Sequence, residues 1–137
     1  MATDYTVSVR SRLVSLFSQD PTLQGFIGAP GRVFDNVPAK TPFPYLRVGD
    51  ADITDFGTKT EPGQEFNLDV HVLDRSSPDR GQKTINLIQA RIYALLHEQA
   101  LSLPSGSAYL CRFVRQVTNN TDGLSWHGIS RYRVLVE

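Results

Sequence analysis

Apolar residues in the first part of the chain repeat at the spacing of an α-helix. Between residues 4 and 19 they fall three, four or one positions apart, which gathers them on one helical side: Tyr5, Val9, Leu13, Leu16 and Phe17. Thr3 or Asp4 can cap the first amides, and Pro21 pushes the residue before it out of helical geometry. The pattern predicts an amphipathic helix over residues 4–19.

Alternating apolar and polar positions predict three strands in the next part of the chain. "RVFDNV" and "YLRVGDADI" are short runs, and "EFNLDVHVL" alternates most clearly, with Phe66, Leu68, Val70 and Val72 on one side. The prolines of "VPAKTPFPY" predict a stiff, extended connection between the first two strands. Polar "TDFGTKTEPGQ" predicts a long hairpin tip before the third. "GFIGAPG" lacks the glycine order of a dinucleotide fingerprint and is predicted to be a loop.

A second helical pattern follows the third strand. Ser77 before Pro78 is a typical helix start. The apolar positions then fall on one side of a helix that "SLPSG" ends: Ile85, Ile88, Ile92, Leu95 and Leu96. "AYLCRFVRQV" and "ISRYRVLVE" are two further strand patterns, joined by "TNNTDGLSWHG".

The order of these elements is helix, three strands, helix, two strands. Consecutive strands joined by turns favour antiparallel pairing. We therefore predict an α+β fold: a mainly antiparallel sheet of four to five strands, two helices packed on one face, and a long protruding β-hairpin. The length of 137 residues fits a single domain over residues 1–137.

The composition is that of an ordinary globular protein, with 40% hydrophobic and 20% charged residues. A formal net charge of zero argues against the positive field of a nucleic-acid binder. Cys111 is the single cysteine, which excludes an internal disulfide and a multi-cysteine zinc site. No run approaches the roughly 20 apolar residues of a membrane-spanning helix.

Three histidines are the candidates for chemistry. Asp69 and His71 could share a metal, but two ligands do not define a site. His97 lies near the end of the second helix, where the dipole favours a cation. A small hydrolase using His127 or His71 is an alternative, although no G-x-S-x-G elbow or phosphate-binding loop occurs. We predict no catalytic residue, no cofactor-binding residue and no metal site.

Charge is distributed unevenly although it sums to zero. Acidic side chains gather between residues 50 and 69, against Lys59 alone: Asp50, Asp52, Asp55, Glu61, Glu65 and Asp69. Arginines gather between residues 110 and 133, against Asp122 alone: Arg112, Arg115, Arg131 and Arg133. One interpretation is that these strands are neighbours and neutralise each other within one subunit. The other is a subunit interface, in which the acidic hairpin of one copy meets the basic strands of the next and the contacts close into a ring.

Several short motifs occur together in a characteristic order. They are "VFDNVP", "PYLRVG", an Arg-Ser pair after the third strand, and "DGLSWHGISRYRV". The residues that carry them are Val33, Asp35, Pro38, Pro44, Tyr45, Gly49, Arg75, Ser76, Asp122, Gly123, His127 and Gly128. In these motifs the chain resembles the tail-completion, or tail-terminator, proteins of long-tailed bacteriophages and gene transfer agents. It departs from them in having Val72, Leu73 and Asp74 where a tryptophan is common before the Arg-Ser pair.

The resemblance implies a structural virion protein rather than an enzyme. Such a protein, assembled in the host cytoplasm, caps the tail tube at the head-tail joint as a ring of six copies, stops tail polymerisation and joins the tail to the head. It implies as partners the chain itself, the major tail tube protein and a head-tail connector or stopper protein, with DNA passing through the lumen without specific binding. A connector or neck ring protein is the alternative within the same machine.

Overall fold

The alternating run around Phe66 forms the centre of a curled, mixed β-sheet. This computed structural model describes residues 4–27, 32–34, 37–38, 40–75, 82–104, 106–120 and 125–137. Strand β3 (Gln64–Arg75) pairs antiparallel with β2 (Tyr45–Asp55) on one side and with β6 (Ser125–Val136) on the other. The long apolar-polar alternation of β3 therefore occupies the position with neighbours on both sides.

Three shorter or outer strands complete the sheet within the described ranges. The strand order is β1-β2-β3-β6-β5-β4, with β1 (Val33–Phe34), β4 (Leu101–Ser102) and β5 (Ser107–Asn120). β1 runs parallel to β2, whereas the other four pairings are antiparallel. The sheet thus ends in a short strand at each side.

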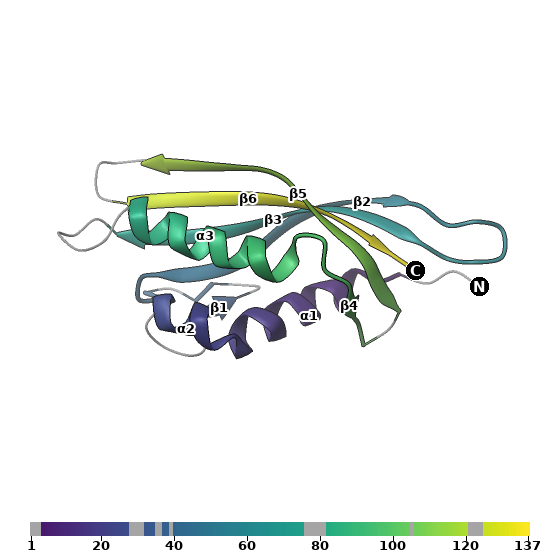
Figure 1. Ribbon diagram of the computed structural model, residues 1–137, viewed down its shortest axis with the longest axis horizontal. Helices are drawn as coiled ribbons and strands as arrows, with labels where there is room; N and C mark the ends of the chain where they lie inside the picture. Colours follow the sequence, from purple (N-terminus) through teal and green to yellow (C-terminus); the bar gives the residue numbers. More distant parts are fainter. Residues whose placement is uncertain are drawn as a thin grey trace.

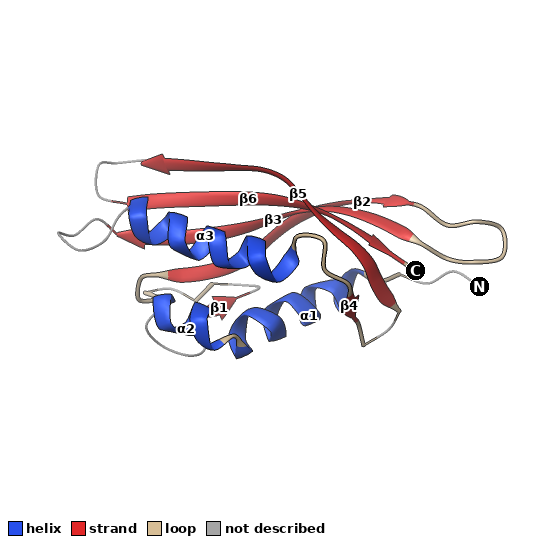
Figure 2. Ribbon diagram, in the orientation of Figure 1, coloured by secondary structure: helices blue, strands red, loops and turns tan. Residues whose placement is uncertain are grey.

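Helices cover only one face of this sheet (Figures 1 and 2). They are α1 (Thr6–Gln19), α2 (Pro21–Ile27) and α3 (Gln82–Leu96). The inward apolar residues of α1 and α3 pack against the inward residues of the strands, and together they form one buried core that includes Leu13, Phe17, Ile88, Ile92, Phe66, Val70 and Tyr132. We call the other face, which carries no described helix, the helix-free face.

The structure describes the start of the first predicted helix but not the predicted start of the second. Tyr5 is the N-cap residue of α1 and makes no side-chain capping bond, whereas Asp4, one residue earlier, accepts hydrogen bonds from the Thr6 amide at 3.0 Å and the Thr6 hydroxyl at 2.6 Å. Tyr5 donates its amide to Gln64 Oε1 at 2.8 Å, which ties this start to β3. Thr3, Ser77 and Pro78 lie outside the described residues.

The prediction of two helices is wrong, because residues 21–27 form a third. The predicted loop "GFIGAPG" begins inside α2, and residues 28–31 lie outside the described ranges. Asp20 ends α1 in an extended conformation and accepts the Leu23 amide through Oδ2 at 2.9 Å, while Pro21 takes the first helical position. The same Asp-Pro pair therefore ends one helix and starts the next.

The prediction of a mainly antiparallel sheet of four to five strands is corrected in its number of strands. The sheet has six described strands, since the short β4 occupies part of the segment predicted only to break the second helix. β1 is parallel to β2, because the proline-containing connection crosses back before β2 begins at Tyr45. Leu46 donates its amide to the Arg32 carbonyl at 2.9 Å, which fixes this crossing.

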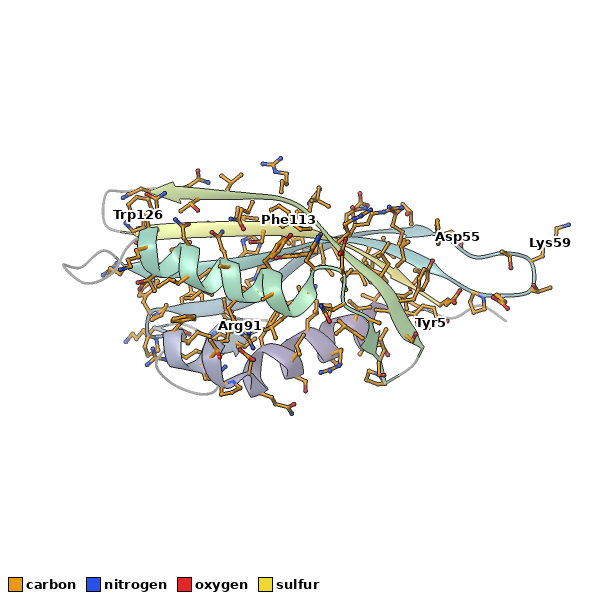
Figure 3. All side chains as sticks on the ribbon, in the orientation of Figure 1. Tyr5, Asp55, Lys59, Arg91, Phe113 and Trp126 are labelled. Carbon is orange, nitrogen blue, oxygen red and sulfur yellow. The ribbon has the colours of Figure 1, made fainter. Side chains whose placement is uncertain are left out.

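The predicted hairpin of β2 and β3 extends beyond the rest of the sheet (Figure 1). Asp55 and Lys59 lie on this extension, far from Trp126 at the other end of the molecule (Figure 3). The turn is closed by backbone hydrogen bonds from Phe56 to the Gly63 carbonyl at 2.9 Å and from Thr58 to the Glu61 carbonyl at 2.8 Å. The extension is therefore an ordered arm.

Asp20 also joins α2 to α3 through an ion pair with Arg91. Arg91 Nε lies 2.9 Å from Oδ2 and Nη2 lies 2.6 Å from Oδ1, a two-point contact. Arg91 holds the pKa of Asp20 below its ordinary value, against the opposing effect of burial. Since only 8% of Asp20 is exposed, loss of Arg91 would leave a carboxylate with little water around it.

We predict that Asp20→Ala lowers the free energy of unfolding by about 2 kcal/mol, because it removes a helix cap and the partner of Arg91. Urea denaturation measures the change. Asp55→Ala is the matched control, since Asp55 is exposed on the hairpin, and we expect it to change stability by less than about 0.5 kcal/mol. Equal losses in the two variants would show that the Asp20 contacts contribute nothing specific.

Candidate functional site

The helix-free face gathers most of the charged side chains singled out from the sequence. Partners in the strand ladders share a face, so Arg112 lies opposite Arg133 and Arg115 opposite Arg131. The same alternation places on this face the predicted interface residues Asp52, Glu65, Arg112, Arg115, Arg131 and Arg133, together with Asp69. The fold therefore brings the acidic and basic segments onto one surface.

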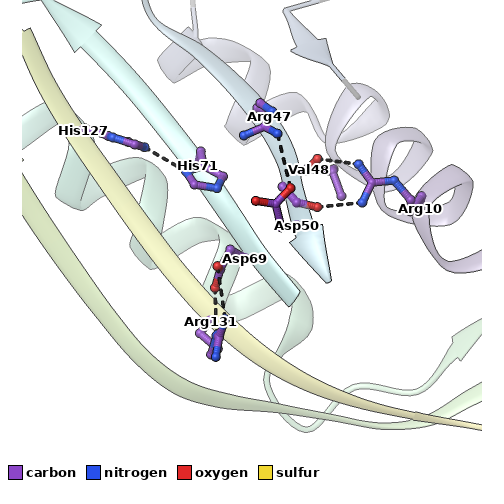
Figure 4. A network of polar contacts seen from close by, with 9 residues as sticks. Arg10, Arg47, Val48, Asp50, Asp69, His71, His127 and Arg131 are labelled. Carbon is purple, nitrogen blue, oxygen red and sulfur yellow. Dashed lines mark hydrogen bonds and ion pairs between the residues drawn. The ribbon is translucent and has the colours of Figure 1, made fainter. Parts of the chain in front are cut away.

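Two of the four arginines are neutralised inside the subunit. Arg131 Nε lies 2.9 Å from Asp69 Oδ1 and Nη2 lies 3.3 Å from Oδ2 (Figure 4). This carboxylate raises the pKa of Arg131 above its ordinary value. Arg133 forms the equivalent contact with Glu65. For these two pairs the charges of neighbouring strands neutralise each other within one subunit, as the first interpretation of the charge pattern states.

The other two arginines are placed differently. Arg112 lies 3.6 Å from Glu98, with both side chains more than half exposed, a geometry worth little in water. Arg115 is exposed on β5 and has no ion pair within the described ranges. It borders a shallow hollow on the helix-free face that Asp69, Val117, Asn119, Ile129 and Arg131 also line.

The acidic residues of β2 and its turn are mostly turned to solvent. Asp50 approaches Arg47 at 3.6 Å, although its own side chain is 93% exposed. Asp55 Oδ1 accepts the Gly57 amide at 3.3 Å, within the turn. Asp52 and Glu61 are exposed and form no ion pair with a described residue. The β2 side of the sheet thus carries exposed acid that forms no close ion pair with a described residue of its own subunit, although Asp52 contributes to the raised pKa of Arg131.

Two of the three histidines meet on the helix-free face. His71 Nδ1 lies 2.8 Å from His127 Nε2, so one ring donates and the other accepts (Figure 4). Burial lowers the pKa of both rings below the ordinary value. The Arg47 cation lowers both further, whereas Asp69 and Asp50 oppose this at His71. The pair is a packed, neutral contact between β3 and β6.

Gly49 is required by this histidine contact. A Cβ atom added at Gly49 would overlap His71 Cδ2 and Nε2, and it would lie 2.9 Å from the Asp69 carbonyl oxygen. Arg10 donates to the Val48 and Gly49 carbonyls at 2.8 and 2.6 Å, which holds β2 at its bulge (Figure 4). The motif residues Gly49 and His127 therefore meet at one packing site, each of them against the ring of His71.

Other motif residues also have packing roles. Gly128 lets α3 approach β6, since a Cβ there would lie 2.6 Å from Gln89 Nε2 and from Ile85 Cγ2. The Tyr45 ring lies 5.4 Å from the Phe43 ring, and the Arg75 guanidinium also lies 5.4 Å from the centre of the Phe43 ring.

The remaining motif residues add less to this site. Val33 is buried, and the Pro38 carbonyl accepts the Thr41 hydroxyl at 2.6 Å. The peptide bond before Pro44 is cis. Asp35, Ser76, Asp122 and Gly123 lie outside the described residues.

The other candidates for chemistry are engaged in the fold. His97 Nδ1 accepts the Phe113 amide at 3.1 Å, and its ring stacks on Tyr93. Burial raises the pKa of Cys111 to about 11, which keeps the thiol protonated at neutral pH. Among the described residues no group of three His, Cys, Asp or Glu side chains is placed to hold a metal ion. No described helix is both long and apolar enough to cross a membrane.

We predict that Gly49→Ala destabilises the fold by about 1–3 kcal/mol, because the new methyl group overlaps the His71 ring and the Asp69 backbone. Gly25→Ala is the control: Gly25 lies in α2 with nothing within 4 Å of a Cβ atom added there, and we expect about 1 kcal/mol of added stability. Chemical denaturation of both variants checks this. A Gly49→Ala protein as stable as the parent would refute the packing role.

We also predict a loss of stability on mild acidification. Both histidines have lowered pKa values in the folded state, so the unfolded chain binds more protons. The stability is complete above the ordinary histidine pKa of about 6.5 and declines as the pH falls through it. Urea midpoints at about pH 7.5 and pH 5.5, on either side of that value, should differ, and the difference should shrink in His127→Gln. A higher midpoint at the lower pH would contradict the prediction.

Comparison with known proteins agrees with the motif resemblance. The sequence profile of the family described as Tail completion protein gp17 matches residues 11–137. The tail completion protein gp17 of Bacillus phage SPP1 is 28% identical over 96 residues, which cover 69% of each chain. A chain in a solved structure described as the virion of a native gene transfer agent particle superposes with a TM-score of 0.84 over 96% of both chains, at 21% identity, and so shares the fold.

The profile match spans nearly the whole chain and includes the β2–β3 hairpin, the histidine contact and the ion pairs of the helix-free face. This confirms the family inferred from the sequence motifs, and with it a structural tail completion protein rather than an enzyme. The chain belongs to the tail completion protein gp17 family.

Proposed function

We propose that the chain caps the end of the tail tube as a ring, stops further polymerisation of the tail and forms the surface that joins the tail to the head. Its partners are five further copies of itself, the major tail tube protein on one side and a head-tail connector or stopper protein on the other. Membership of the tail completion family supports a role at the end of tail assembly.

The observation that best supports a ring is the distance between the charged side chains that form no ion pair with a described residue of the same subunit. Asp52 and Glu61 lie on β2 and its turn, whereas Arg115 lies on β5, and two whole strands stand between β2 and β5. These groups are too far apart to neutralise each other within one subunit. A second copy brings them together, and because the two surfaces differ, each contact leaves the same pair of surfaces open for the next copy.

The charge pattern also suits passage of DNA. Net charge is zero, and the Arg131 and Arg133 cations on the helix-free face are each held by a carboxylate of the same subunit. Arginines already paired with a carboxylate release few counterions from the phosphate backbone, and on this face only Arg112 and Arg115 of the four are not held closely in this way. We therefore assign the helix-free face to the lumen, with no specific DNA contact.

Deletion of the coding sequence in the virus or particle that carries it tests this function. We predict tails of irregular and excessive length that lack heads, because nothing ends polymerisation, and rescue by the wild-type chain in trans. Electron microscopy of lysates measures tail lengths. Tails of normal length that fail to join filled heads would instead identify a connector or neck protein, and normal intact particles would refute both roles.

A further inference from the structure

The sheet has two open edges in the described part of the chain. At one side, β4 covers β5 only at Ser107 and Ala108, and the end of α3 reaches the Cys111 carbonyl and Phe113 amide. Beyond these contacts, residues 114–119 of β5 face no described strand on their outer side. An uncovered strand edge presents alternate backbone donors and acceptors to a further strand.

The opposite side of the sheet is open in the same way. β1 covers β2 only at Leu46 and Arg47, and Arg10 holds the next two carbonyls. Asp50 lies in the bulge, and residues 51–55 of β2 then pair with β3 on their inner side and with no described strand on their outer side. Neither segment, VRQVTN or DADITD, contains a proline, which is the usual block to strand addition.

A β-bulge separates the covered part of each edge from the open part. In β5 the register shifts between Phe113 and Arg115, and in β2 it shifts between Val48 and Ala51. After the bulge, β2 pairs with β3 from Ala51 onward and β5 pairs with β6 from Arg115 onward, both without a further shift in register. From Arg115 in β5 and from Ala51 in β2 the open segments are therefore regular strands, which can accept a partner.

Strand directions fix how two copies could join. β2, β3, β6 and β5 are each antiparallel to the next, so β5 runs opposite to β2. Copies related by rotation about one axis keep this relation, and the edge of β5 in one copy meets the edge of β2 in the next as an antiparallel pair.

The two open edges are also offset along the sheet. Residues 51–55 lie level with residues 132–136 of β6, whereas residues 115–119 lie level with residues 127–131. Joining them displaces each copy along the strand direction relative to the last. A sheet that closes on itself needs this displacement, because its strands are tilted to the axis and their register is staggered.

The charges at the two edges are complementary. Arg115 on β5 and Asp52 on β2 both project from the helix-free face, are exposed, and have no ion pair with a described residue. Opposite charges across an antiparallel pair attract, and two like edges, β5 with β5 or β2 with β2, bring like charges together. The pattern favours the mixed edge over a symmetric dimer.

We propose, resting on the ring function above, that the ring is closed by strand addition: residues 114–119 of β5 in one copy pair antiparallel with residues 50–55 of β2 in the next. In this register Arg115 of one copy lies opposite Thr54 of its neighbour and diagonally across from Asp52, on the same face and within reach of the long arginine side chain. The result is one sheet continuous through all subunits, with the helix-free face on its inner side. Each open edge is therefore occupied by another copy of this chain, β5 by one neighbour and β2 by the other.

Charge exchange on purified tails lacking this protein tests the contact. We expect Arg115→Glu and Asp52→Arg each to weaken formation of the ring at least about tenfold, and the double variant to restore most of it. Lys83→Glu, the same change at an exposed site on α3, is the control and should bind as the wild type does. Thermal unfolding confirms that each variant folds. A double variant no better than the single ones overturns the pairing.

Hydrogen exchange tests the backbone contact itself. The amides in residues 50–55 and 114–119 that point away from the inner neighbouring strand should exchange at least about tenfold more slowly in the ring on the tail than in the free chain. Binding to tails without this slowing overturns the strand addition but leaves the capping function intact. Failure of the wild type to bind tails overturns the capping function and, with it, the ring. Cross-links from Arg115→Cys to the tube protein, rather than to Asp52→Cys of a second copy, would also overturn the proposal.

Discussion

The pairing of β3 with β6 is the contact on which the rest of the structure depends. On one side of these two strands Phe66, Val70 and Tyr132 are buried against the helices. On the other side Asp69 pairs with Arg131, and His71 with His127. Because side chains alternate strictly between faces, a shift of one residue would bury the charges and expose the core. The register is thus set twice, by apolar burial and by ion pairing.

The position of this central pair explains why both interpretations of the charge pattern apply, neutralisation within one subunit for some residues and contact between subunits for others. Arg131 and Arg133 lie on β6 beside β3, and their carboxylate partners are one strand away. Arg115 lies one strand further out and forms no ion pair with a described acid, and Asp52 lies at the opposite side of the sheet. Strands at the centre neutralise each other, whereas strands at the edges need another subunit to do so.

Much of the fold follows from periodicity alone. α1, α3 and the four long strands are predictable from their spacing, since each buries a continuous apolar side. α2 is not predictable in this way, because its seven residues are too few to show a period. Its Asp-Pro start nevertheless resembles the Ser-Pro signal of the second predicted helix. β1 and β4 have two residues each, and their place depends on the neighbours that cover them. The contact of His71 with His127 joins residues 56 positions apart, and only the strand order brings them together.

The most direct test of the ring is a density map of the completed tail end, at a resolution that separates strands. We predict one ring of this chain at the end of the tube, with β5 of each subunit beside β2 of the next and the helix-free face toward the channel. A ring in which these two edges face solvent, or a chain placed away from the tube end, would contradict the proposed arrangement.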